Sequence, residues 1–480
     1  MKLSQGLVRR SLDGHGWLGL LVAALMFVVC LSGTIAVFYP ELERWEQPGV
    51  AESTAWDPAT LEAGFNRFLA DPERLTPHMS LYLPTADFPR TRMANEEAAW
   101  LVGADGFPGE RERHPYTHLL TNVHLYLTLP QSWGMILVSA LGALLFALVV
   151  SGFLAHPRLV RDAFLFRWGR GDRLEQVDLH NRLSVWGAPF YLVIAVTGAW
   201  FGLVLPLVGT ATALTGESRP AIVASVFGEE PQAAGGPRAE LARAFAALEA
   251  LHPAAEPISV TVHEADQPDR FFELSARHPE RMIWSENYRF DMQGNYLGRV
   301  GFSDGGFGRQ VAYSMYRLHF GHFDGLASKL LYAALGLALT VVSASGVNIW
   351  LARRSRRDAL DLLWPGLVWG FPFALVACAL LSTAGLPVGT PALWGTTGLA
   401  LAAAVAAGDV RRARHWLRGA LAAACIALVS LHALRHGASS LAGAALGVNG
   451  ALLLTALLLA LGGLRERRSA STTASLVLES

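Results

Sequence analysis

The sequence predicts an all-α membrane bundle of eight transmembrane helices, with a small α+β module in each of its two longest loops. The first observation is composition, because 52% of the 480 residues are hydrophobic and only 16% are charged, whereas soluble domains carry about a quarter charged residues. The second is that the apolar residues gather in uncharged stretches of about 20 residues, the length that one helix needs to cross a bilayer. The third is the regular placement of basic clusters between these stretches.

Eight apolar stretches are expected to be membrane helices: residues 17–39, 133–155, 184–208, 326–351, 366–384, 391–408, 419–436 and 443–463. Arginine and lysine mark the cytoplasmic side of a membrane protein. Basic clusters occur before the first stretch and after every second one, at residues 2–10, 158–173, 353–357, 411–418 and 465–468. Both termini are therefore expected in the cytoplasm. The first stretch is too long for a signal peptide and is followed by ELERWE, so it is expected to remain as an anchor.

The two longest loops, 40–132 and 209–325, then lie on the outer side and contain strand-and-turn patterns. The second reads ISVTVHEADQPDRFFELSA and then NYRFDMQGNYLG, with Gly294 in a turn, and the first reads AAWLVGADGFPGER, with a turn at Asp105-Gly106. The expected domains are the first helix (1–39), an outer module (40–132), two helices with a cytoplasmic loop (133–208), a second outer module (209–325), the fourth helix (326–357) and a four-helix extension (358–480).

An internal repeat relates the first two helices to the next two. The pattern H-x-x-L occurs at His15 and again at His180, 165 residues later, and Ser32-Gly33 matches Thr197-Gly198 at the same offset. The stretch SALGALLFALVVSG (139–152) matches AALGLALTVVSASG (333–346) at an offset of 194. Two copies of one hairpin that both begin inside are parallel repeats. The duplicated hairpins are predicted to form a four-helix core.

Four histidines occupy repeat-related positions in this core. His15 and His180 are expected to face one another on the inner side, and His124 and His319, which are 195 residues apart, on the outer side. A b-type haem between helices requires two neutral imidazoles on opposite faces of the iron. The pattern predicts two b haems, with these four histidines as axial ligands of the iron. Small residues would let a porphyrin approach closely, and arginines such as Arg182 and Arg317 could meet its propionates.

Other histidines leave alternatives open. His156 and His322 are alternate ligands for the inner and outer sites, and His114 and His118 are surface residues or an outer metal contact. His432 and His436 lie on one helix face, with a ligand role disfavoured. His78, His252, His263, His278 and His415 are interpreted as solvated.

Motifs of other chemistries are missing from the sequence. The three cysteines, Cys30, Cys378 and Cys425, lie in apolar runs and indicate no disulfide framework or metal cluster. There is no C-x-x-C-H for covalent haem attachment, no ATP-binding G-x-x-x-x-G-K-[ST] and no strand-borne G-x-G-x-x-G. No catalytic residue is identified beyond the proposed ligands.

The chain resembles the PepSY-associated transmembrane family, often called iron-regulated membrane proteins, over residues 1–357. The resemblance rests on the H-x-x-L-[GS] starts at His15 and His180, the two outer PepSY-like modules, LHFGHFDG (318–325), and the helix ends SGFLAHPR and SGVNIWLARR. It implies a siderophore-iron reductase of the Gram-negative inner membrane, with bis-histidine b haems, which reduces a ferric chelate on the periplasmic side and so releases Fe(II).

The partners implied by this resemblance are a ferric siderophore or other Fe(III) chelate, a cytoplasmic or membrane electron donor, and the lipid bilayer. No nucleic-acid partner is expected. The alternatives are a siderophore or iron transporter, and a non-catalytic assembly or regulatory protein. The near absence of charge from the helices disfavours a transporter.

Overall fold

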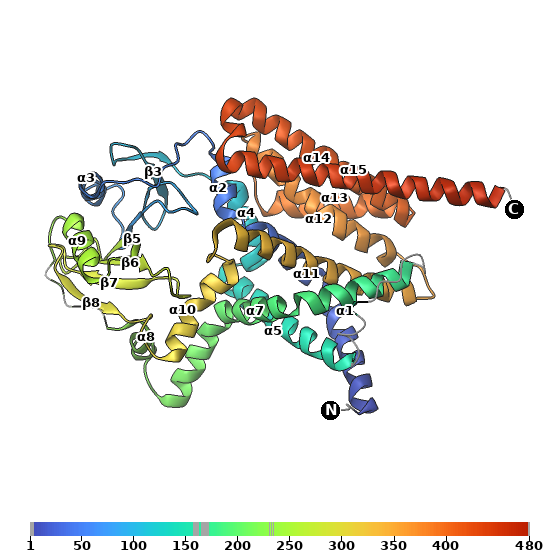
Figure 1. Ribbon diagram of the computed structural model, residues 1–480, viewed down its shortest axis with the longest axis horizontal. Coiled ribbons are helices and arrows are strands. Elements are labelled where there is room, and N and C mark those ends of the chain that lie inside the picture. The colour runs from blue at the N-terminus through green and yellow to red at the C-terminus, as the bar shows by residue number, and fades with distance from the viewer. Residues whose placement is uncertain are drawn as a thin grey trace. The chain divides into compact units, whose positions relative to one another are not determined.

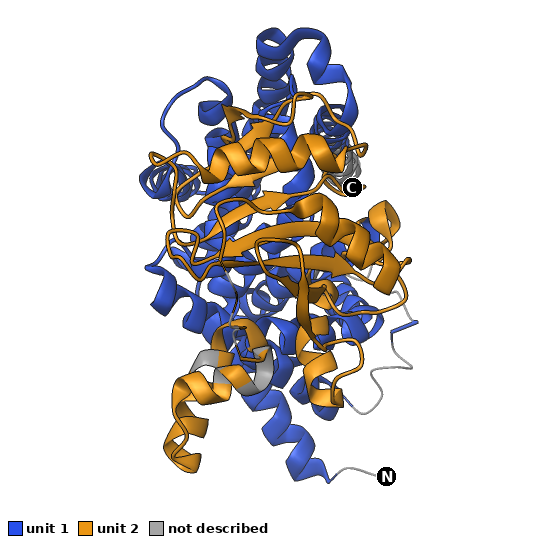
Figure 2. Ribbon diagram, turned by 90° about the vertical axis from the view of Figure 1, so that its left-hand side faces the viewer, with its two compact units in different colours: residues 1–50, 114–199, 330–480 blue, residues 51–113, 200–329 orange. Residues whose placement is uncertain are grey.

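The computed structural model describes residues 4–156, 163, 164, 172–229, 231, 233 and 235–478. The chain forms two compact units, coloured separately in Figure 2. The helical unit comprises residues 1–50, 114–199 and 330–480, and the sheet unit comprises residues 51–113 and 200–329. Most of the predicted basic segment 158–173, and Lys2, lie outside the described residues.

Seven helices among the described residues are long and apolar enough to cross a membrane. In Figure 1 they are α1 (Gln5–Ala36), α5 (Gln131–Ala155), α7 (Asp172–Thr215), α11 (Gly325–Arg353), α12 (Leu360–Thr383), α14 (Val410–His436) and α15 (Gly443–Leu478). Each overlaps one predicted span. The remaining predicted span, 391–408, corresponds to α13 (Thr390–Ala406), which has 17 residues. This length lies at the lower limit for crossing a bilayer, so seven of the eight predicted spans are supported by the structure and the eighth stays a prediction.

The first and third spans begin earlier than the apolar pattern indicates. Helix α1 starts at Gln5 because the side chain of Ser4 accepts a hydrogen bond from the backbone N–H of Leu7, a typical N-cap. Helix α7 already starts at Asp172. Polar residues continue a helix where lipid does not surround it, so the apolar run marks only part of each helix. As a result, His15 and His180 lie inside α1 and α7 instead of just before the predicted helix starts at residues 17 and 184.

The first four spans pack in a pattern that follows the predicted repeat. A Cβ atom on Gly142 of α5 would lie 2.8 Å from the backbone nitrogen of Ala199 in α7, and one on Gly336 of α11 would lie 2.6 Å from Thr34 Oγ1 in α1. The two glycines differ by 194 residues and their two partners by 165, which are the offsets of the repeat. Equivalent close approaches therefore join the second helix of each hairpin to the first helix of the other.

The C-terminal extension packs onto the core through two short helices, α2 (Tyr39–Glu46) and α4 (Pro115–Tyr126). Ser382 of α12 donates a hydrogen bond of 2.8 Å to Glu46, and Trp394 of α13 donates one of 2.8 Å to Thr128, just after α4. A 3₁₀ helix (Gly437–Leu441) joins α14 to α15. The extension is thus held by polar contacts as well as by apolar packing.

The sheet unit contains one antiparallel sheet of eight strands in the order β4-β3-β2-β1-β5-β6-β7-β8. The strands are β1 (Met79–Tyr82), β2 (Arg92–Ala94), β3 (Ala99–Val102), β4 (Pro108–Arg111), β5 (Glu256–His263), β6 (Phe271–Arg277), β7 (Glu286–Phe290) and β8 (Tyr296–Val300). The helices of this unit include α3 (Pro58–Leu69), α8 (Arg219–Phe227), α9 (Leu241–Leu251) and α10 (Phe307–Phe320). Apolar residues of α3 and α9 form one core with Met79, Leu81 and Val262 of the sheet.

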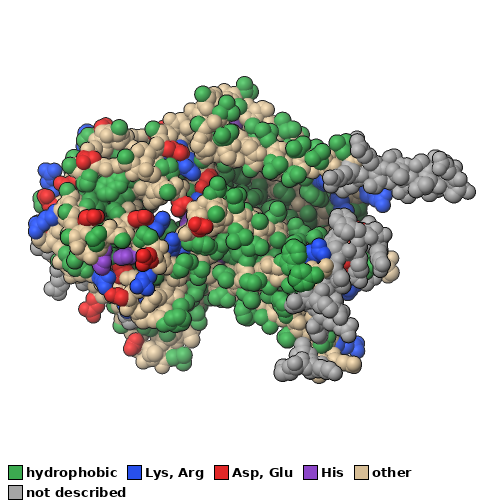
Figure 3. All heavy atoms as spheres, in the orientation of Figure 1, with side chains coloured by type: hydrophobic (Ala, Val, Ile, Leu, Met, Phe, Trp, Pro, Cys, Tyr) green, Lys and Arg blue, Asp and Glu red, His purple; other side chains and the backbone are tan. Residues whose placement is uncertain are grey.

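The sequence predicted one small module in each loop. In the structure, strands from both loops belong to one continuous sheet. Strand β1 from the first loop pairs with β5 from the second, with Met79 opposite Val262 and Tyr82 opposite Ser259. Each loop alone would expose the edge of its own small sheet, and pairing the two edges satisfies their backbone hydrogen bonds. Figure 3 shows charged side chains and histidines gathered over this unit, whereas apolar side chains dominate the visible face of the helical unit.

Candidate functional site

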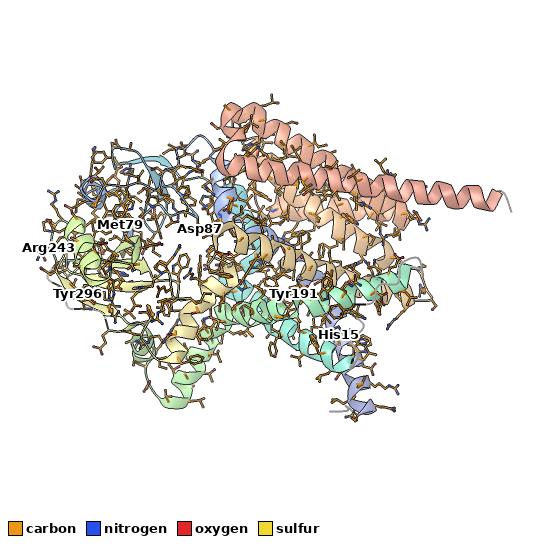
Figure 4. The ribbon with its side chains drawn as sticks, in the orientation of Figure 1. His15, Met79, Asp87, Tyr191, Arg243 and Tyr296 are labelled. Carbon is orange, nitrogen blue, oxygen red and sulfur yellow. The ribbon has the colours of Figure 1, made fainter. Side chains whose placement is uncertain are left out.

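The four core helices line a cavity of about 510 Å³ in the helical unit. Cofactor sites commonly have volumes of about 300–1,000 Å³ and mostly apolar walls. Here α1, α5, α7 and α11 all contribute to the lining. Both predicted inner ligands, His15 and His180, belong to this lining, and so does the alternate His156. His15 and Tyr191, which also lines the cavity, are labelled in Figure 4.

The structure brings His15 and His180 together. Their ring centres are 6.4 Å apart and their ring planes form an angle of 84°. Two imidazoles that bind one metal ion from opposite sides, with bonds of about 2 Å, have ring centres about 6 Å apart. The separation therefore fits a shared ion between the rings.

Each of the two rings is fixed by the same kind of contact. His15 Nδ1 lies 3.0 Å from the carbonyl oxygen of Leu148 and 3.2 Å from the hydroxyl of Ser151, both on α5. His180 Nδ1 lies 3.1 Å from the carbonyl oxygen of Val342 and 3.1 Å from the hydroxyl of Ser345, both on α11. The partners are again related by the offset of 194. In both rings, an Nδ1–H that donates to a carbonyl leaves Nε2 with a lone pair for a metal.

The surroundings of the pair also fit a large planar cofactor. Gly152 and Gly346, a repeat-related pair, lie beside the two rings: a Cβ would be 3.3 Å from His15 Cε1 in the first case and 3.5 Å from His180 Cε1 in the second. The first contact is tight and the second is an ordinary van der Waals contact, so a Cβ would crowd the His15 ring and would just touch the His180 ring. Most of the remaining lining is apolar, from residues such as Leu20, Met26, Leu145 and Leu339. The donor set is two imidazoles without a thiolate, which matches b-type haem ligation.

The arginine that lines the cavity is not one of the two arginines that the sequence indicated as partners of the propionates. Arg353 belongs to the cavity lining, whereas Arg182 does not. The Arg182 guanidinium donates a hydrogen bond to the Ala163 carbonyl and lies over the ring of Trp186. Arg353 is therefore the arginine of the described cavity lining that is available to a carboxylate of a bound group. His156, at the end of α5, is exposed and follows the last helical residue.

His124, predicted as an outer ligand, has an environment like that of His15 and His180. It lies on α4, and its Nδ1 is 3.0 Å from the carbonyl oxygen of Val29 in α1. Gly33 of α1 is so close that a Cβ there would lie 2.5 Å from His124 Cε1. Burial lowers the pKa of His124, although the Val29 carbonyl acts in the opposite direction. The ring is therefore neutral at pH 7, as a metal ligand must be.

His319 and its alternate His322 belong to the sheet unit. His319 lies near the end of α10, with its ring centre 5.4 Å from that of Phe201. His322 follows the helix cap at Gly321 and is buried near Trp284 and Tyr316. Burial lowers the pKa of His322 to about 4. Arg317, the second arginine that the sequence indicated, donates to the backbone carbonyls of His322 and Arg281.

Three further histidines, His114, His118 and His432, differ in their burial and in their contacts. His118 is exposed, as the surface interpretation predicted, and His114 is partly buried with Nε2 3.6 Å from a Glu43 oxygen. His432 is buried, and both of its ring nitrogens have hydrogen-bond partners, the Trp45 carbonyl and the Asn449 amide.

Two of the histidines interpreted as solvated, His263 and His278, are partly buried. Burial lowers the pKa of His263 to about 4 and also lowers the pKa of His278. Phe271 and Tyr288 on the neighbouring strands cover part of these two side chains. The alternating strand pattern gave no sign of which neighbour would lie beside them.

Comparison with known proteins identifies the family of this chain. The PepSY-associated TM region matches residues 12–353, and the chain belongs to that family. The matched segment starts three residues before His15 and ends at Arg353, so it includes the whole lining of the cavity from His15 onward and leaves out the extension. A protein of Pseudomonas aeruginosa, described as uncharacterised, is 30% identical over 348 residues, which cover 66% of this chain and 87% of that protein.

Proposed function

We propose that this protein is a dihaem b-type electron carrier of the bacterial inner membrane that reduces a ferric siderophore, or another Fe(III) chelate, on the periplasmic side. The observation that carries the proposal is the His15–His180 pair, with ring centres 6.4 Å apart in a mostly apolar cavity. In this proposal both termini are cytoplasmic, and His15 and His180 hold the haem nearer to the cytoplasm. A bound haem would supply reversible one-electron chemistry at iron.

The chain's own residues would determine the orientation of the inner ligands. The carbonyl oxygens of Leu148 and Val342 accept hydrogen bonds from Nδ1 of His15 and of His180 and so select the tautomer that presents Nε2 to iron. A backbone acceptor cannot rotate away as a side chain can. The hydroxyls of Ser151 and Ser345 give each ring a second contact and limit its rotation.

His124 and His319 are proposed as ligands of the outer haem. Support for His124 is its contact with the Val29 carbonyl, which repeats the chemistry of the inner pair nearer the other end of α1. His319 is its repeat-related counterpart in the sequence. His156 and His322 remain the alternates.

The reduction itself needs one electron for each iron. A chelator with hard oxygen donors holds Fe(III) tightly and Fe(II) much less tightly, because the lower charge weakens each iron–oxygen bond. One electron passes from the reduced protein to the chelate, iron goes from Fe(III) to Fe(II), and the ligand is released without breaking a covalent bond. A cytoplasmic or membrane donor of one electron must then restore the protein.

The proposal is tested with full-length protein in detergent, reduced anaerobically and mixed with a ferric hydroxamate in the presence of a chromogenic Fe(II) chelator. We expect the reduced b-type absorption bands to disappear while one Fe(II) forms for each electron lost. The Ga(III) form of the same hydroxamate is the matched control, because gallium keeps the shape and charge of the complex but accepts no electron. Bands that persist with the ferric chelate, or that disappear equally with gallium, would contradict the proposed reduction.

A further inference from the structure

A second pair of histidines lies in the sheet unit, and neither residue belongs to the lining of the cavity. The ring centres of His78 and His263 are 5.4 Å apart, and the ring planes form an angle of 87°. His78 comes from the first loop and precedes Met79, the first residue of β1, which is labelled in Figure 4. His263 comes from the second loop and is the last residue of β5. The pair therefore exists only because β1 and β5 join the two loops.

The strand register places these histidines in a row with two further side chains. Because Met79 pairs with Val262, the preceding residue His78 falls opposite His263. Because Ser80 pairs with Ala94, Glu96 falls opposite His78 on the other side. His263 itself pairs with Phe271 of β6. Side chains directly opposite on antiparallel strands point to one face, with Cβ atoms about 4.5–5.5 Å apart.

The contacts within this row agree with the register. His78 Nδ1 lies 2.8 Å from Glu96 Oε1, and the His263 ring stacks on Phe271 at 5.0 Å between ring centres. Met79 and Val262 are fully buried in the core beneath α3 and α9. Because neighbouring residues of a strand alternate between the two faces, the histidine row lies on the face opposite to these helices.

Each ring of the His78–His263 pair keeps one nitrogen that can bind a metal ion. When the Nδ1–H of His78 donates to Glu96, its Nε2 has a lone pair for a metal, and a carboxylate behind an imidazole is the usual support of a metal-binding histidine. His263 Nε2 is buried and has no hydrogen-bond partner within the described part of the chain. Two imidazoles on adjacent coordination positions of one ion, with bonds of about 2 Å, have ring centres about 5 Å apart, close to the observed separation.

The charge around the row is compatible with a cation. Glu96 contributes a carboxylate next to His78. The nearest cationic influence on His263 is Arg289, whose Nε donates to Glu273 Oε2 at 3.2 Å. This arginine is therefore already paired with a carboxylate. His78 keeps half of its side chain exposed, which gives an ion from solution a route to the pair.

We propose that His78 and His263 bind a divalent transition-metal ion, with Glu96 as the positioning residue of His78. Imidazole ligands suit Zn(II), Cu(II), Ni(II) and Fe(II), and solvent would complete the coordination of an ion at this partly open site. The site does not depend on the proposed reductase function, because none of its residues lines the cavity or belongs to the proposed haem ligands.

The test is equilibrium dialysis of Zn(II) against full-length protein in detergent. We expect the wild type to bind one more Zn(II) ion than the double variant H78A/H263A, and each single variant to weaken that binding at least about 100-fold, because one imidazole alone is a poor chelator. The variant E96Q keeps a hydrogen-bond acceptor at His78 but removes the charge, and should weaken binding about 10- to 100-fold.

The chain offers a matched control in His252 and His278, a pair in the same unit with ring centres 5.5 Å apart. Nε2 of His278 is 2.9 Å from the Tyr288 hydroxyl. In this pair, therefore, Nε2 of one ring already has a hydrogen-bond partner, whereas Nε2 of His263 has none within the described residues. The variant H252A/H278A should bind as much Zn(II) as the wild type. Equal Zn(II) binding by wild type and H78A/H263A, or an equal loss in H252A/H278A, would overturn the proposal. The far-ultraviolet circular dichroism of each variant checks that the fold is retained.

Discussion

The protein contains two histidine pairs that differ in the distance between their rings. His15 and His180 lie on membrane helices with ring centres 6.4 Å apart, and His78 and His263 lie on a sheet with ring centres 5.4 Å apart. The larger separation fits two ligands on opposite sides of an ion, which leaves a plane between them for a porphyrin. The smaller separation fits adjacent positions on a small ion. A difference of about 1 Å thus separates two kinds of metal chemistry.

The two pairs also differ in how each ring is held. In the helical pair, backbone carbonyls of α5 and α11 fix Nδ1, and these acceptors cannot be removed by substitution. In the sheet pair, the half-exposed carboxylate of Glu96 contacts the ring of His78, and the ring of His263 is held by stacking on Phe271. The helical pair is therefore preorganised, and the sheet pair is adjustable. This contrast leads to four predictions, from the largest expected effect to the smallest.

The substitution Gly33→Val should remove most haem from the outer site. Even a Cβ at this position would lie 2.5 Å from the His124 ring, so the branched side chain must displace that ring. Total haem, measured as the pyridine haemochrome, should fall by about half if the protein carries two haems. Gly14→Ala on the same helix is the control, because a Cβ there meets nothing within 4 Å. Full haem content in Gly33→Val would show that His124 is not a ligand.

The substitution His432→Ala should destabilise the protein without loss of haem. Both nitrogens of His432 are hydrogen-bonded, and its ring stacks on Trp45 at 4.6 Å, so the residue joins the extension to α2. Loss of these contacts and of a buried side chain should cost roughly 2–4 kcal/mol, seen as a lower midpoint of thermal unfolding. A change in the b-type spectrum would instead assign His432 a role at a haem.

The substitutions Ser151→Ala and Ser345→Ala should have small and equal effects. Each removes a hydroxyl next to Nδ1 of one inner ligand but leaves the backbone carbonyl in place. We expect haem affinity, measured by transfer to apomyoglobin, to fall less than about 10-fold, the lower limit for loss of a supporting hydrogen bond. The sheet variant E96Q, which loses its charge, should show a larger change in Zn(II) affinity. Unequal haem affinities of the two serine variants would mean that the two repeats do not support their ligands alike.

The stability of the sheet unit should fall as the pH is lowered from 6.5 towards 4. Burial, with Lys329, Arg277 and Arg317 nearby, lowers the pKa of His322 to about 4, while Asp87 acts in the opposite direction. In this window the unfolded chain binds a proton at His322 and the folded chain does not, so acid favours unfolding. His322→Gln should flatten the dependence of the unfolding midpoint on pH. An unchanged slope in this variant would assign the effect to other groups.

The sequence was sufficient to predict the helical core and its inner pair. Uncharged apolar stretches indicated each of the seven candidate spans, and the offsets of 165 and 194 predicted that His15 and His180 would meet. These are signals of composition and of repetition, which need no knowledge of long-range contacts. The helix α13 has 17 residues against the 18 of the predicted span 391–408, so the apolar pattern located the helix, and its length is at the lower limit for a span.

The sheet and its histidine row could not be predicted in the same way. The pairing of β1 with β5 joins residues that are far apart in the sequence, and neither strand contains a signal for its partner. A shift of the register by one residue would turn His78 and His263 to opposite faces. The interpretation of both as solvated followed from their polar neighbours alone. The same limit applies to His432, whose partners Trp45 and Asn449 come from other helices.

The most direct test of the central claim is the haem content of purified protein with and without His180. The reduced-minus-oxidised absorption spectrum and the haem-to-protein ratio are measured for the wild type, His15→Ala, His180→Ala and the exposed control His118→Ala. The account predicts about two b haems in the wild type and in His118→Ala, and about one in each inner-ligand variant. A wild-type protein without haem from haem-replete cells, or inner-ligand variants that retain the wild-type ratio and spectrum, would contradict it.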